Sequence, residues 1–570
     1  MPGILFVLNP SENLLQGALM QLQDIGYHVK QISLRVKDCF VANYAYESYP
    51  FHVYRKGDQI ILMEGMVYSK EVLQAEHLFD QFFSTDGFRH ERIAQWVEKA
   101  DGEFLFLLFD LKLQQALFVN DRFGRLPLYV IQKGRRVVVS REIRFARMIM
   151  ESADTDSLAS AQTLLFGFAL GDRTLWKNVK RFSPFAQFQI DLINGRCKQW
   201  DYFKWPQQQA ATLTSNETDC LLDLFRKATS NRIQKLSNPA ISLSGGLDSR
   251  LIAAVVAESE PSVPFFTYDD ASGSAKSDIK AVEEILFRLE IKKRHQFIKL
   301  PEAGEKQMRE LMRIKQGLNG PDMAFLIRFL KFFRNDNFTM ITGDGGDKVL
   351  ADLRPLVKIS SQRQMLHYLL RKHVQIQPRT AAMLCGISPS ELLSSIRMVL
   401  ESYEANSFEE QHAQFMIRER AMKWLFEGED RNRYFCWSTT PFYHPGFFDL
   451  AMGLPMREKA SGKVFLSMFQ LLKGKLEDVN NPNWNTPLSS QKDIEKVYAK
   501  QKLYYMLPDF MISNLRKVNS TVMGIDDFIF GFQLRKALSE ELEKMNLHKT
   551  MSMKLSSETW FRVLGLVDVM

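Results

Sequence analysis

The sequence predicts a two-domain protein, in which a strand-rich α+β domain precedes an α/β domain with a parallel sheet and a helical C-terminal part. The first observation is the length of 570 residues, which exceeds what one typical core holds. The second is a series of short apolar runs, separated by turn residues, up to about residue 200. The third is the alternation of apolar strands and helical segments beyond residue 240, which is typical of a parallel sheet with crossover helices.

The N-terminal 200 residues are expected to consist mostly of strands. Helical periodicity interrupts them at residues 14–22 and 157–165. The runs expected to form strands are Ile4–Leu8, Gln59–Met63, Phe104–Phe109, Ala116–Val119, Leu128–Ile131 and Arg136–Ser140.

A polar segment with a proline, Trp205–Asp219, predicts a linker between a domain of residues 1–204 and a domain of residues 220–570. From Pro355 onward the pattern is mostly helical. In the second domain, the first expected elements are strands Ala240–Leu243, Val263–Tyr268 and His295–Leu300, and helices Ser249–Glu258 and about Ser277–Leu289.

The composition narrows the class of protein. A hydrophobic fraction of 45% and a charged fraction of 25% are typical of a soluble globular protein. No apolar stretch is long enough for a membrane span and no signal peptide is visible, so a cytoplasmic location without a membrane partner is expected. The 5 cysteines form no CxxC pair, which disfavours a zinc site. The 74 basic and 66 acidic residues are interspersed, which disfavours nucleic-acid binding.

The stretch ISLSGGLDSRLIAAV, Ile241–Val255, predicts a strand, a glycine-rich turn and a helix. In that geometry backbone N–H groups and the helix N-terminus bind phosphate. Gly245 and Gly246 allow a ligand to approach the backbone, and Ser244 offers a hydroxyl. A carboxylate at Asp248, beside a polyphosphate, makes sense if it holds a cation. The alternative is a serine-rich turn that only caps a helix.

A second turn follows a later apolar strand in FTMITGDGGDKVLADL, Phe338–Leu353. It contributes the carboxylates Asp344 and Asp347. One aspartate from each turn, Asp248 and Asp347, is what a Mg²⁺ ion bridging pyrophosphate oxygens requires.

The first turn resembles the pyrophosphate loop of the ATP-pyrophosphatase superfamily, and the second resembles the asparagine-synthetase signature S-G-E-G-A-D-E-L-F-G-G. Lys348, Ala351 and Asp352 depart from that signature. Asp278 matches an acidic residue that opens a helix in the family, and an N-cap role is an equal alternative. The resemblance implies ATP and Mg²⁺ as cofactors, Asp248, Asp344 and Asp347 as catalytic residues, Asp248 and Asp347 as metal ligands, and a nucleotide site of Leu243, Ser244, Gly245, Gly246, Leu247, Ser249, Thr267, Gly343, Gly345 and Gly346.

The N-terminal domain resembles the N-terminal-nucleophile glutaminase domain of the same family. Met63–Ser69 lies where the family has F-N-G-E-I-Y-N, Ala100–Asp110 matches D-G-x-F-A-F-x-x-x-D, and Val119–Val130 matches A-R-D-R-x-G-x-x-P-L-Y-Y. The resemblance implies a sandwich of the N-terminal-nucleophile type in a degenerate form, because the family start M-C-G-I is replaced by Met1-Pro2-Gly3-Ile4.

Three features predict that this domain has lost glutaminase activity. Pro2 replaces the nucleophilic cysteine, and Glu64 replaces the asparagine that donates to the oxyanion. The H-R-G-P-D segment is absent before residue 60. Asp101 and Gly102 of the glutamine pocket persist, and we interpret them as structural. In an alternative reading, removal of Met1 would give Pro2 a free amine, but Glu64 opposes the oxyanion that such a nucleophile needs.

The segment expected to bind the acid substrate matches the family motifs less completely. Phe426–Phe469 resembles a family segment, with matches at Asp430, Arg431, Pro441, Phe442, Leu454, Pro455 and Lys463. The glutamate before Pro-Phe is missing, and Ser438–Thr440 occupies its region, which predicts a roomier and less acidic pocket. The lysine expected about twenty residues after Lys463 is absent, and Lys473, Lys475 and Lys492 are its candidate substitutes.

Together these features predict an ATP-dependent, AMP-forming amide ligase that adenylates a carboxylate and joins it to an amine or ammonia. Similar glutaminase-inactive relatives are β-lactam synthetases and lasso-peptide cyclases, which favours a peptide- or metabolite-tailoring cyclase acting on a small-molecule or peptide carboxylate. A precursor peptide and tailoring enzymes are candidate partners, and a homodimer is a candidate assembly. The alternatives are an asparagine synthetase fed by free ammonia and an ATP-binding pseudoenzyme.

Overall fold

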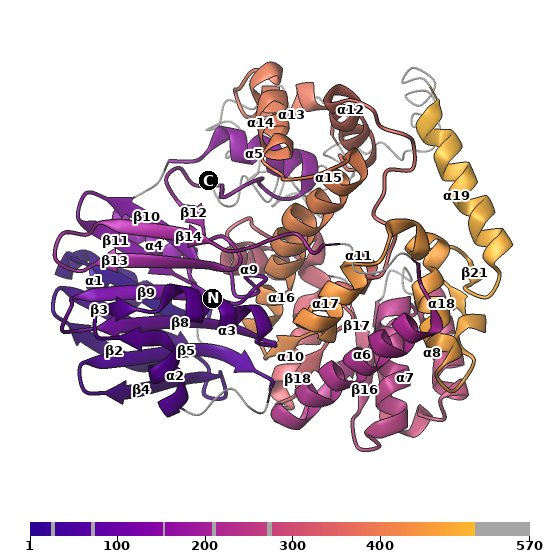
Figure 1. Cartoon of the computed structure of the whole chain (residues 1–570), viewed down its shortest axis with the longest axis horizontal. Coiled ribbons are helices and arrows are strands. Elements are labelled where there is room, and N and C mark those ends of the chain that lie inside the picture. The colour runs from indigo at the N-terminus through magenta and orange to yellow at the C-terminus, as the bar shows by residue number, and fades with distance from the viewer. Residues whose placement is uncertain are drawn as a thin grey trace.

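The structure is a computed structural model that describes residues 1–507 apart from 24–28, 70–74, 152–153, 208–211, 271–275, 302 and 375. Figure 1 shows two antiparallel sheets on the left and a parallel sheet at the lower right, with a group of helices above and around it. The predicted α+β domain followed by an α/β domain is confirmed.

The first antiparallel sheet has six strands in the order β12-β10-β11-β1-β3-β2. The second has the order β14-β13-β9-β8-β5-β4. The strands of the first sheet are β1 (Gly3–Leu8), β2 (Val29–Val36), β3 (Cys39–Ala45), β10 (Tyr129–Lys133), β11 (Arg136–Ser140) and β12 (Lys180–Arg181). Those of the second are β4 (Phe51–Lys56), β5 (Gln59–Val67), β8 (Gly102–Asp110), β9 (Gln115–Asn120), β13 (Ala186–Asp191) and β14 (Cys197–Asp201).

The two sheets form a sandwich covered by helices. Successive side chains of a strand point to opposite faces, so Ile4 and Phe6 pack in a core with Leu107 of the other sheet, while Leu5 packs with α1 and α4. The outer face of the second sheet packs on α2 and α3. The helices and the small hairpin of this half are α1 (Glu12–Gln23), α2 (Ala75–Phe82), α3 (His90–Lys99), α4 (Ile143–Met150), α5 (Ser157–Phe166), β6 (Phe83–Ser84) and β7 (Gly87–Phe88).

The parallel sheet has the order β17-β16-β15-β18-β19. Its strands are β15 (Pro239–Ser242), β16 (Phe265–Asp270), β17 (His295–Leu300), β18 (Thr339–Ile341) and β19 (Ser438–Thr439). The helical elements connected with it are α6 (Ser215–Lys235), α7 (Leu247–Ser259), α8 (Lys276–Arg288), η1 (Lys292–Arg294), α9 (Glu305–Lys315), η2 (Pro321–Phe325), α10 (Leu326–Asn335) and α11 (Gly346–Val349).

The remaining described chain is helical except for β19 and one short hairpin, as expected beyond Pro355. Its elements are α12 (Gln362–Lys372), α13 (Pro378–Leu384), α14 (Pro389–Glu401), α15 (Phe408–Gln414), the π-helix η3 (Phe415–Leu425), α16 (Phe426–Arg433), η4 (Pro441–Tyr443), α17 (Pro445–Met452), η5 (Met456–Gly462), α18 (Lys463–Gln470), η6 (Leu476–Asp478), β20 (Asn480–Asn481), β21 (Thr486–Pro487) and α19 (Gln491–Met506). None of the described helices is long and apolar enough to cross a bilayer.

The expected elements agree with the structure to within a few residues, with two kinds of difference. Leu243 follows the last residue of β15, and Leu128 precedes the first residue of β10, so both lie just outside the hydrogen-bonded strands. The strands of residues 29–56 and 180–201 and the helices α2, α3 and α4 were not expected. The last sandwich strand ends at Asp201 and α6 begins at Ser215, but the domain boundaries themselves remain a prediction.

Buried ion pairs join the two halves of the chain. Arg125 contacts Glu103 of the N-terminal half and lies 2.7 Å from Glu429 of α16. Arg141 contacts Asp430 of α16, and both side chains are fully buried. Further pairs across the boundary are Arg122–Asp449, Arg181–Glu427 and Arg232–Asp101. Because an unpaired buried charge is costly, these pairs favour one arrangement of the halves.

Candidate active site

The two turns predicted to bind phosphate meet at the carboxyl ends of neighbouring parallel strands. β15 and β18 pair directly, and the chain leaves each strand into a glycine-rich turn that opens a helix. The Asp347 backbone N–H donates a hydrogen bond to the Asp248 carboxylate over 3.0 Å. Ligands of open α/β sheets bind at this edge, so the structure places both predicted metal ligands where a nucleotide is expected.

The first turn is held by its own serines. The Ser249 hydroxyl accepts a hydrogen bond from the Ser244 N–H and donates to the Ser244 carbonyl, each at 3.0 Å. The Ser244 hydroxyl accepts from the Gly246 N–H at 3.3 Å. These hydrogen bonds within the chain fix the turn, and α7 begins with Gly246 as its N-cap residue. Such pre-organisation reduces the entropic cost of binding an anion at the helix N-terminus.

Glycines are required where the two turns touch. A Cβ at Gly343 would lie 2.6 Å from the Ser249 nitrogen, and one at Gly346 would lie 2.6 Å from the Asp248 carboxyl carbon. Gly345 has φ +100°, and a side chain there would also overlap the Tyr443 ring. The predicted glycines of the second turn are thus explained by close packing, in addition to any contact with a ligand.

Thr267, Leu243 and Asp278 support the first turn from behind. The Thr267 hydroxyl donates to the Leu243 carbonyl at 2.8 Å and contacts His295 at the same distance. Asp278, in the first turn of α8, accepts a hydrogen bond from the Gly245 N–H at 2.9 Å. Leu243 and Leu247 are buried. These four residues, as placed here, shape the turn, and Asp278 is neither an N-cap nor a member of the carboxylate pair.

The carboxylates at the junction have shifted acidity. Burial and then the neighbouring Asp347 charge raise the pKa of Asp248 well above its ordinary value. Burial and then the Glu429 charge raise the pKa of Asp344 to about 6. A cation bound beside Asp248 would favour the ionised form of its carboxylate.

Lys348 supplies a positive charge at the same place. Its ammonium contacts the Asp347 carboxylate, and Lys348 itself is buried. The oxygen donors of Asp248 and Asp347 have the chemistry that Mg²⁺ prefers, and the Asp347 side chain is 59% exposed, so it can turn from Lys348 to a cation. Among the described residues, no group of three or more His, Cys, Asp or Glu side chains is arranged to hold a metal ion.

Two family models match this chain. The model described as asparagine synthase matches residues 221–432, and the model described as glutamine amidotransferase domain matches residues 48–201. Both matches fall on the halves in which the corresponding motifs lie. The chain belongs to the asparagine synthetase family.

The curated relatives that match this chain have low sequence identity to it. The chain is 27% identical over 233 residues to asparagine synthetase [glutamine-hydrolyzing] 3 of Bacillus subtilis (strain 168), which covers 37% of each chain. It is 25% identical over 339 residues to asparagine synthetase [glutamine-hydrolyzing] 1 of the same organism, covering 54% of this chain and 51% of the relative. The match therefore spans about half or less of the length of these relatives.

Other similarities are weaker. Amidase chry2 of Gibberella zeae is 25% identical over 221 residues, covering 36% of this chain and 32% of that protein. A solved structure of the allosteric regulatory enzyme of purine biosynthesis has a TM-score of 0.25 and 11% identity, covering 72% of this chain and 94% of the other. NMN synthetase from Francisella tularensis has a TM-score of 0.20 and 16% identity, covering 36% and 94%. These structural likenesses carry no argument about function.

Pro2 stands where the resemblance places the family's nucleophile, and a buried ion pair lies beside the next residue, Gly3. Glu64 is fully buried and lies directly against Gly3, next to Pro2. Its carboxylate accepts hydrogen bonds from the Ile4 N–H at 2.8 Å, from the Tyr49 hydroxyl at 2.6 Å and from Arg141 at 2.9 Å. The Ile4 N–H, the Tyr49 hydroxyl and the Arg141 guanidinium thus all donate to one buried carboxylate.

Two further expectations about the N-terminal half are informed by the structure. Asp101 pairs with Arg232 of α6 at 2.8 Å, which agrees with a structural interpretation of Asp101. Met1 is buried in a cluster with Ala240 and Cys436 of the C-terminal half, and the alternative of a free amine on Pro2 stays a prediction.

The acceptor segment differs from expectation at Ser438–Thr440. These residues are fully buried, with β19 in the centre of the molecule. The Thr439 hydroxyl donates to Glu103 at 2.7 Å. They line no roomy pocket, because they pair with β18 and face the N-terminal half, and the neighbouring helix α16 brings in carboxylates. The expectation of a less acidic pocket at this place is therefore wrong.

The segment expected to supply a lysine lies against the first turn. Arg250 donates to the carbonyls of Leu476, Val479 and Asn480 and to that of Gly245, at 2.7–3.0 Å. The Pro482 ring lies beside Gly245. The residues of this hairpin are Asn, Pro, Trp and Thr, and the candidates Lys473, Lys475 and Lys492 are exposed.

Sequence reasoning missed Lys459, which is fully buried in η5. Its ammonium donates to the Val349 carbonyl, at the end of α11, at 2.8 Å and contacts the Met452 sulfur at 3.5 Å. Burial lowers the pKa of Lys459 to about 7. It also missed Arg250 and Tyr443. The position of Arg250 directly after S-G-G-L-D-S is the one signal that pointed to any of the three.

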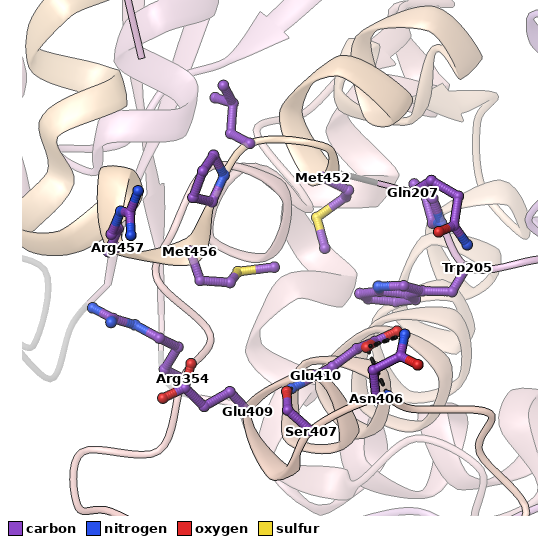
Figure 2. A pocket seen from close by; sticks show the side chains of 13 residues that line it. Trp205, Gln207, Arg354, Asn406, Ser407, Glu409, Glu410, Met452, Met456 and Arg457 are labelled. Carbon is purple, nitrogen blue, oxygen red and sulfur yellow. Dashed lines mark hydrogen bonds between the residues drawn. The ribbon is translucent and has the colours of Figure 1, made fainter. Parts of the chain in front are cut away.

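A cavity of about 480 Å³ is lined by Met452, whose sulfur contacts Lys459. Figure 2 shows the Trp205 ring and the sulfurs of Met452 and Met456 lining it, with Arg354 and Arg457 at another side. The remaining lining residues are Pro206, Gln207, Asn406, Ser407, Glu409, Glu410, Leu454 and Pro455. The lining thus combines an apolar wall with two guanidinium groups and two carboxylates.

Proposed function

We propose that this member of the asparagine synthetase family is an ATP-dependent, AMP-forming amide ligase that works without a glutaminase of its own. The observation that carries the proposal is the contact between the two turns, where the Asp347 N–H donates to the Asp248 carboxylate at the edge of a parallel sheet. The family's activity supports it, and the site residues predicted from the sequence are assigned here on that basis.

The proposed site binds ATP through backbone groups. The N-terminus of α7 binds the β- and γ-phosphates, and the turn of residues 244–247 keeps its shape through its hydrogen bonds to Ser244, Ser249 and Asp278. Asp248 and Asp347 hold Mg²⁺, which neutralises phosphate charge when it is bound. The Lys348 ammonium, released from Asp347 in this state, remains close to the phosphates and contributes a second positive charge.

The reaction then follows in two steps. A carboxylate oxygen of the organic substrate attacks the α-phosphorus, the bond to pyrophosphate breaks, and an acyl-adenylate forms. An amine nitrogen attacks the acyl carbon, AMP leaves, and the nitrogen gives up a proton. Asp344, with its pKa of about 6, is proposed to accept that proton.

In this proposal the protein does not take its nitrogen from glutamine. The Glu64 carboxylate occupies the place of an oxyanion donor, and Pro2 has no thiol. We propose that the amine comes from free ammonia or from the substrate itself, as in a peptide- or metabolite-tailoring cyclase. The cavity at Trp205 supports an organic acid larger than aspartate, because its volume of about 480 Å³ lies in the range of sites for drug-sized ligands.

A second candidate is an ATP-binding pseudoenzyme, and one observation favours it. The Lys348 ammonium already neutralises Asp347, and the hairpin next to the first turn carries no lysine to stabilise amide formation. Such a protein would bind nucleotide and activate no acid.

Exchange of labelled pyrophosphate into ATP tests the proposal. A panel of amphipathic acids, peptide carboxylates and aspartate is offered with Mg·ATP. Exchange with a larger acid supports the tailoring ligase. Exchange with aspartate, followed by asparagine formation with ammonium, favours the plain synthetase. ATP binding without exchange for any acid favours the pseudoenzyme.

A further inference from the structure

A second cavity, of about 300 Å³, lies between the two halves of the chain and apart from the two turns. Its N-terminal wall comes from loops that contain Phe123, Gly171 and Phe203. Its C-terminal wall comes from the end of α14 and the loop after it, including Tyr403, and from the π-helix η3. None of the residues assigned to ATP lines it.

Arg418 of η3 points its guanidinium into an aromatic clamp at this cavity. The guanidinium carbon lies 5.6 Å from the centre of the Phe203 ring and 5.2 Å from the centre of the Tyr403 ring. Within the described chain the side chain of Arg418 makes no hydrogen bond and no ion pair. Stacking uses the faces of a guanidinium, so its N–H donors at the edge remain available.

The other cations at the cavity already have partners. Lys423 contacts Glu419, and Arg181 pairs with Glu427 at 3.1 Å and donates to the Met422 carbonyl at 2.7 Å. Of the three described cationic side chains that line the cavity, Arg418 alone has no hydrogen-bond or ion-pair partner within the described chain.

The helix that carries Arg418 is fixed from two sides. Glu419, the next residue, accepts a hydrogen bond from the Gly171 N–H at 3.1 Å and another from the Tyr403 hydroxyl at 3.1 Å. The Glu419 carboxylate therefore holds one ring of the clamp and one loop of the cavity. A π-helix is a rare structure that is often found at functional sites, and here it places Arg418 and Glu419 on the cavity together.

We propose that this cavity binds a small organic carboxylate, with the acid on the guanidinium of Arg418 and an apolar body against the rings. An arginine fork matches the two oxygens of a carboxylate. A phosphate dianion fits less well, because Asp172, Asp201 and Glu419 bring negative charge to the same cavity. The volume lies at the lower end for ligand sites, which favours a single amino-acid-sized acid over a peptide or nucleotide.

The test compares 3-phenylpropionate, its neutral amide 3-phenylpropanamide and inorganic phosphate as probes of the full chain by ligand-observed NMR. We expect the carboxylate to bind the wild type, and the amide and phosphate to bind at least about 10-fold more weakly. Arg418→Gln should weaken carboxylate binding about 10-fold or more, with a melting temperature close to that of the wild type. Arg420→Gln is the matched control, because Arg420 lies on the same helix, stacks on Trp424 and does not line the cavity.

Arg418→Lys provides a second variant should the glutamine variant fold poorly. It keeps the charge but loses the fork, so carboxylate binding should fall between that of the wild type and that of Arg418→Gln. Three results would overturn the proposal: no binding of the carboxylate by the wild type, equal losses in Arg418→Gln and Arg420→Gln, or tighter binding of phosphate than of the carboxylate.

Discussion

The backbone of Asp347 donates to the side chain of Asp248 over 3.0 Å, although 99 residues separate the two. β15 and β18 are neighbours in the parallel sheet, so their following turns meet at the same edge. The contact places two carboxylates together, and burial and the Asp347 charge both raise the pKa of Asp248. The cost of this arrangement is explained if a cation and phosphates complete the site.

Asp248→Asn and Asp347→Asn should each slow pyrophosphate release by about 10²-fold or more, because each removes a charged metal ligand. Asparagine keeps an oxygen that can accept from the Asp347 N–H, so the first turn should persist and the melting temperature should change little. The measurement is pyrophosphate exchange with the cognate acid, beside thermal unfolding.

Asp352→Asn is the matched control for these variants. Asp352 lies on the same segment but pairs with Arg354, at 2.8 Å. Near-normal exchange is expected for it. Near-normal exchange in both Asp248→Asn and Asp347→Asn would instead contradict their assignment.

The sequence was most informative where the structure is local. The turn after β15 is made by Ser244, Gly246 and Ser249, which are within six residues of one another, and their bonds follow from the motif. The order of strands and helices around it is equally local. The second turn was predicted to share the site because one aspartate from each turn is what a bridging Mg²⁺ ion requires.

The contacts between the halves could not be predicted in this way. Arg125 and Glu429 are 304 residues apart, and their pairing depends on the docking of a finished sandwich on a finished α/β domain. Ser438–Thr440 was misplaced for the same reason, because nothing in that stretch shows that β19 is covered by Glu103. Lys459 was missed since its neighbours in sequence do not show that it is buried.

The purified protein should release no ammonia from glutamine above a control without enzyme. Pro2 lacks a thiol, and the Glu64 carboxylate opposes an oxyanion. Pro2→Cys alone should not restore the activity, because Glu64 remains paired with Arg141. A glutamine-dependent release of ammonia by the wild type would disprove the inactive-glutaminase proposal.

Glu64→Gln should reveal how much the buried pair contributes to stability. Glu64 and Arg141 are both fully buried, so the change leaves Arg141 with Asp430 as its one described carboxylate partner. A loss of about 3 kcal/mol in the free energy of unfolding is expected. Chemical denaturation measures it, and Glu12→Gln, which breaks an exposed pair with Arg35, should cost far less, because solvent screens that pair.

Gly345→Ala should disturb the second turn more than a loss of backbone freedom explains. Gly345 has φ +100°, and a side chain there overlaps the Tyr443 ring. Gly386 also has positive φ, +66°, but has open space around it, so Gly386→Ala reports the backbone strain alone. We expect a clearly larger fall in melting temperature and in pyrophosphate exchange for Gly345→Ala; equal effects would mean that Tyr443 does not hold the turn.

Lys459→Met should stabilise the protein, and by an amount that depends on pH. Burial lowers the pKa of Lys459 to about 7, from an ordinary 10.5. Below pH 7 the lysine is protonated in both states, so the folded state bears the full cost of the buried charge. Between these pKa values the unfolded chain holds a proton that the folded chain has lost, so stability of the wild type rises with pH, by up to about 1.4 kcal/mol per unit.

The advantage of Lys459→Met over the wild type should therefore be largest at pH 6 and shrink steadily toward pH 10. The methionine leaves the Val349 carbonyl without its lysine donor, which reduces the gain by about 1 kcal/mol at every pH and does not alter the trend. Lys463→Met, at an exposed position of the adjoining helix, corrects for other groups that titrate over the same range. Free energies of unfolding at pH 6, 8 and 10 give the measurement. A difference between Lys459→Met and Lys463→Met that stays constant with pH would show that Lys459 keeps its proton in the folded protein, and the ammonium would then have to be stabilised by the site around α11.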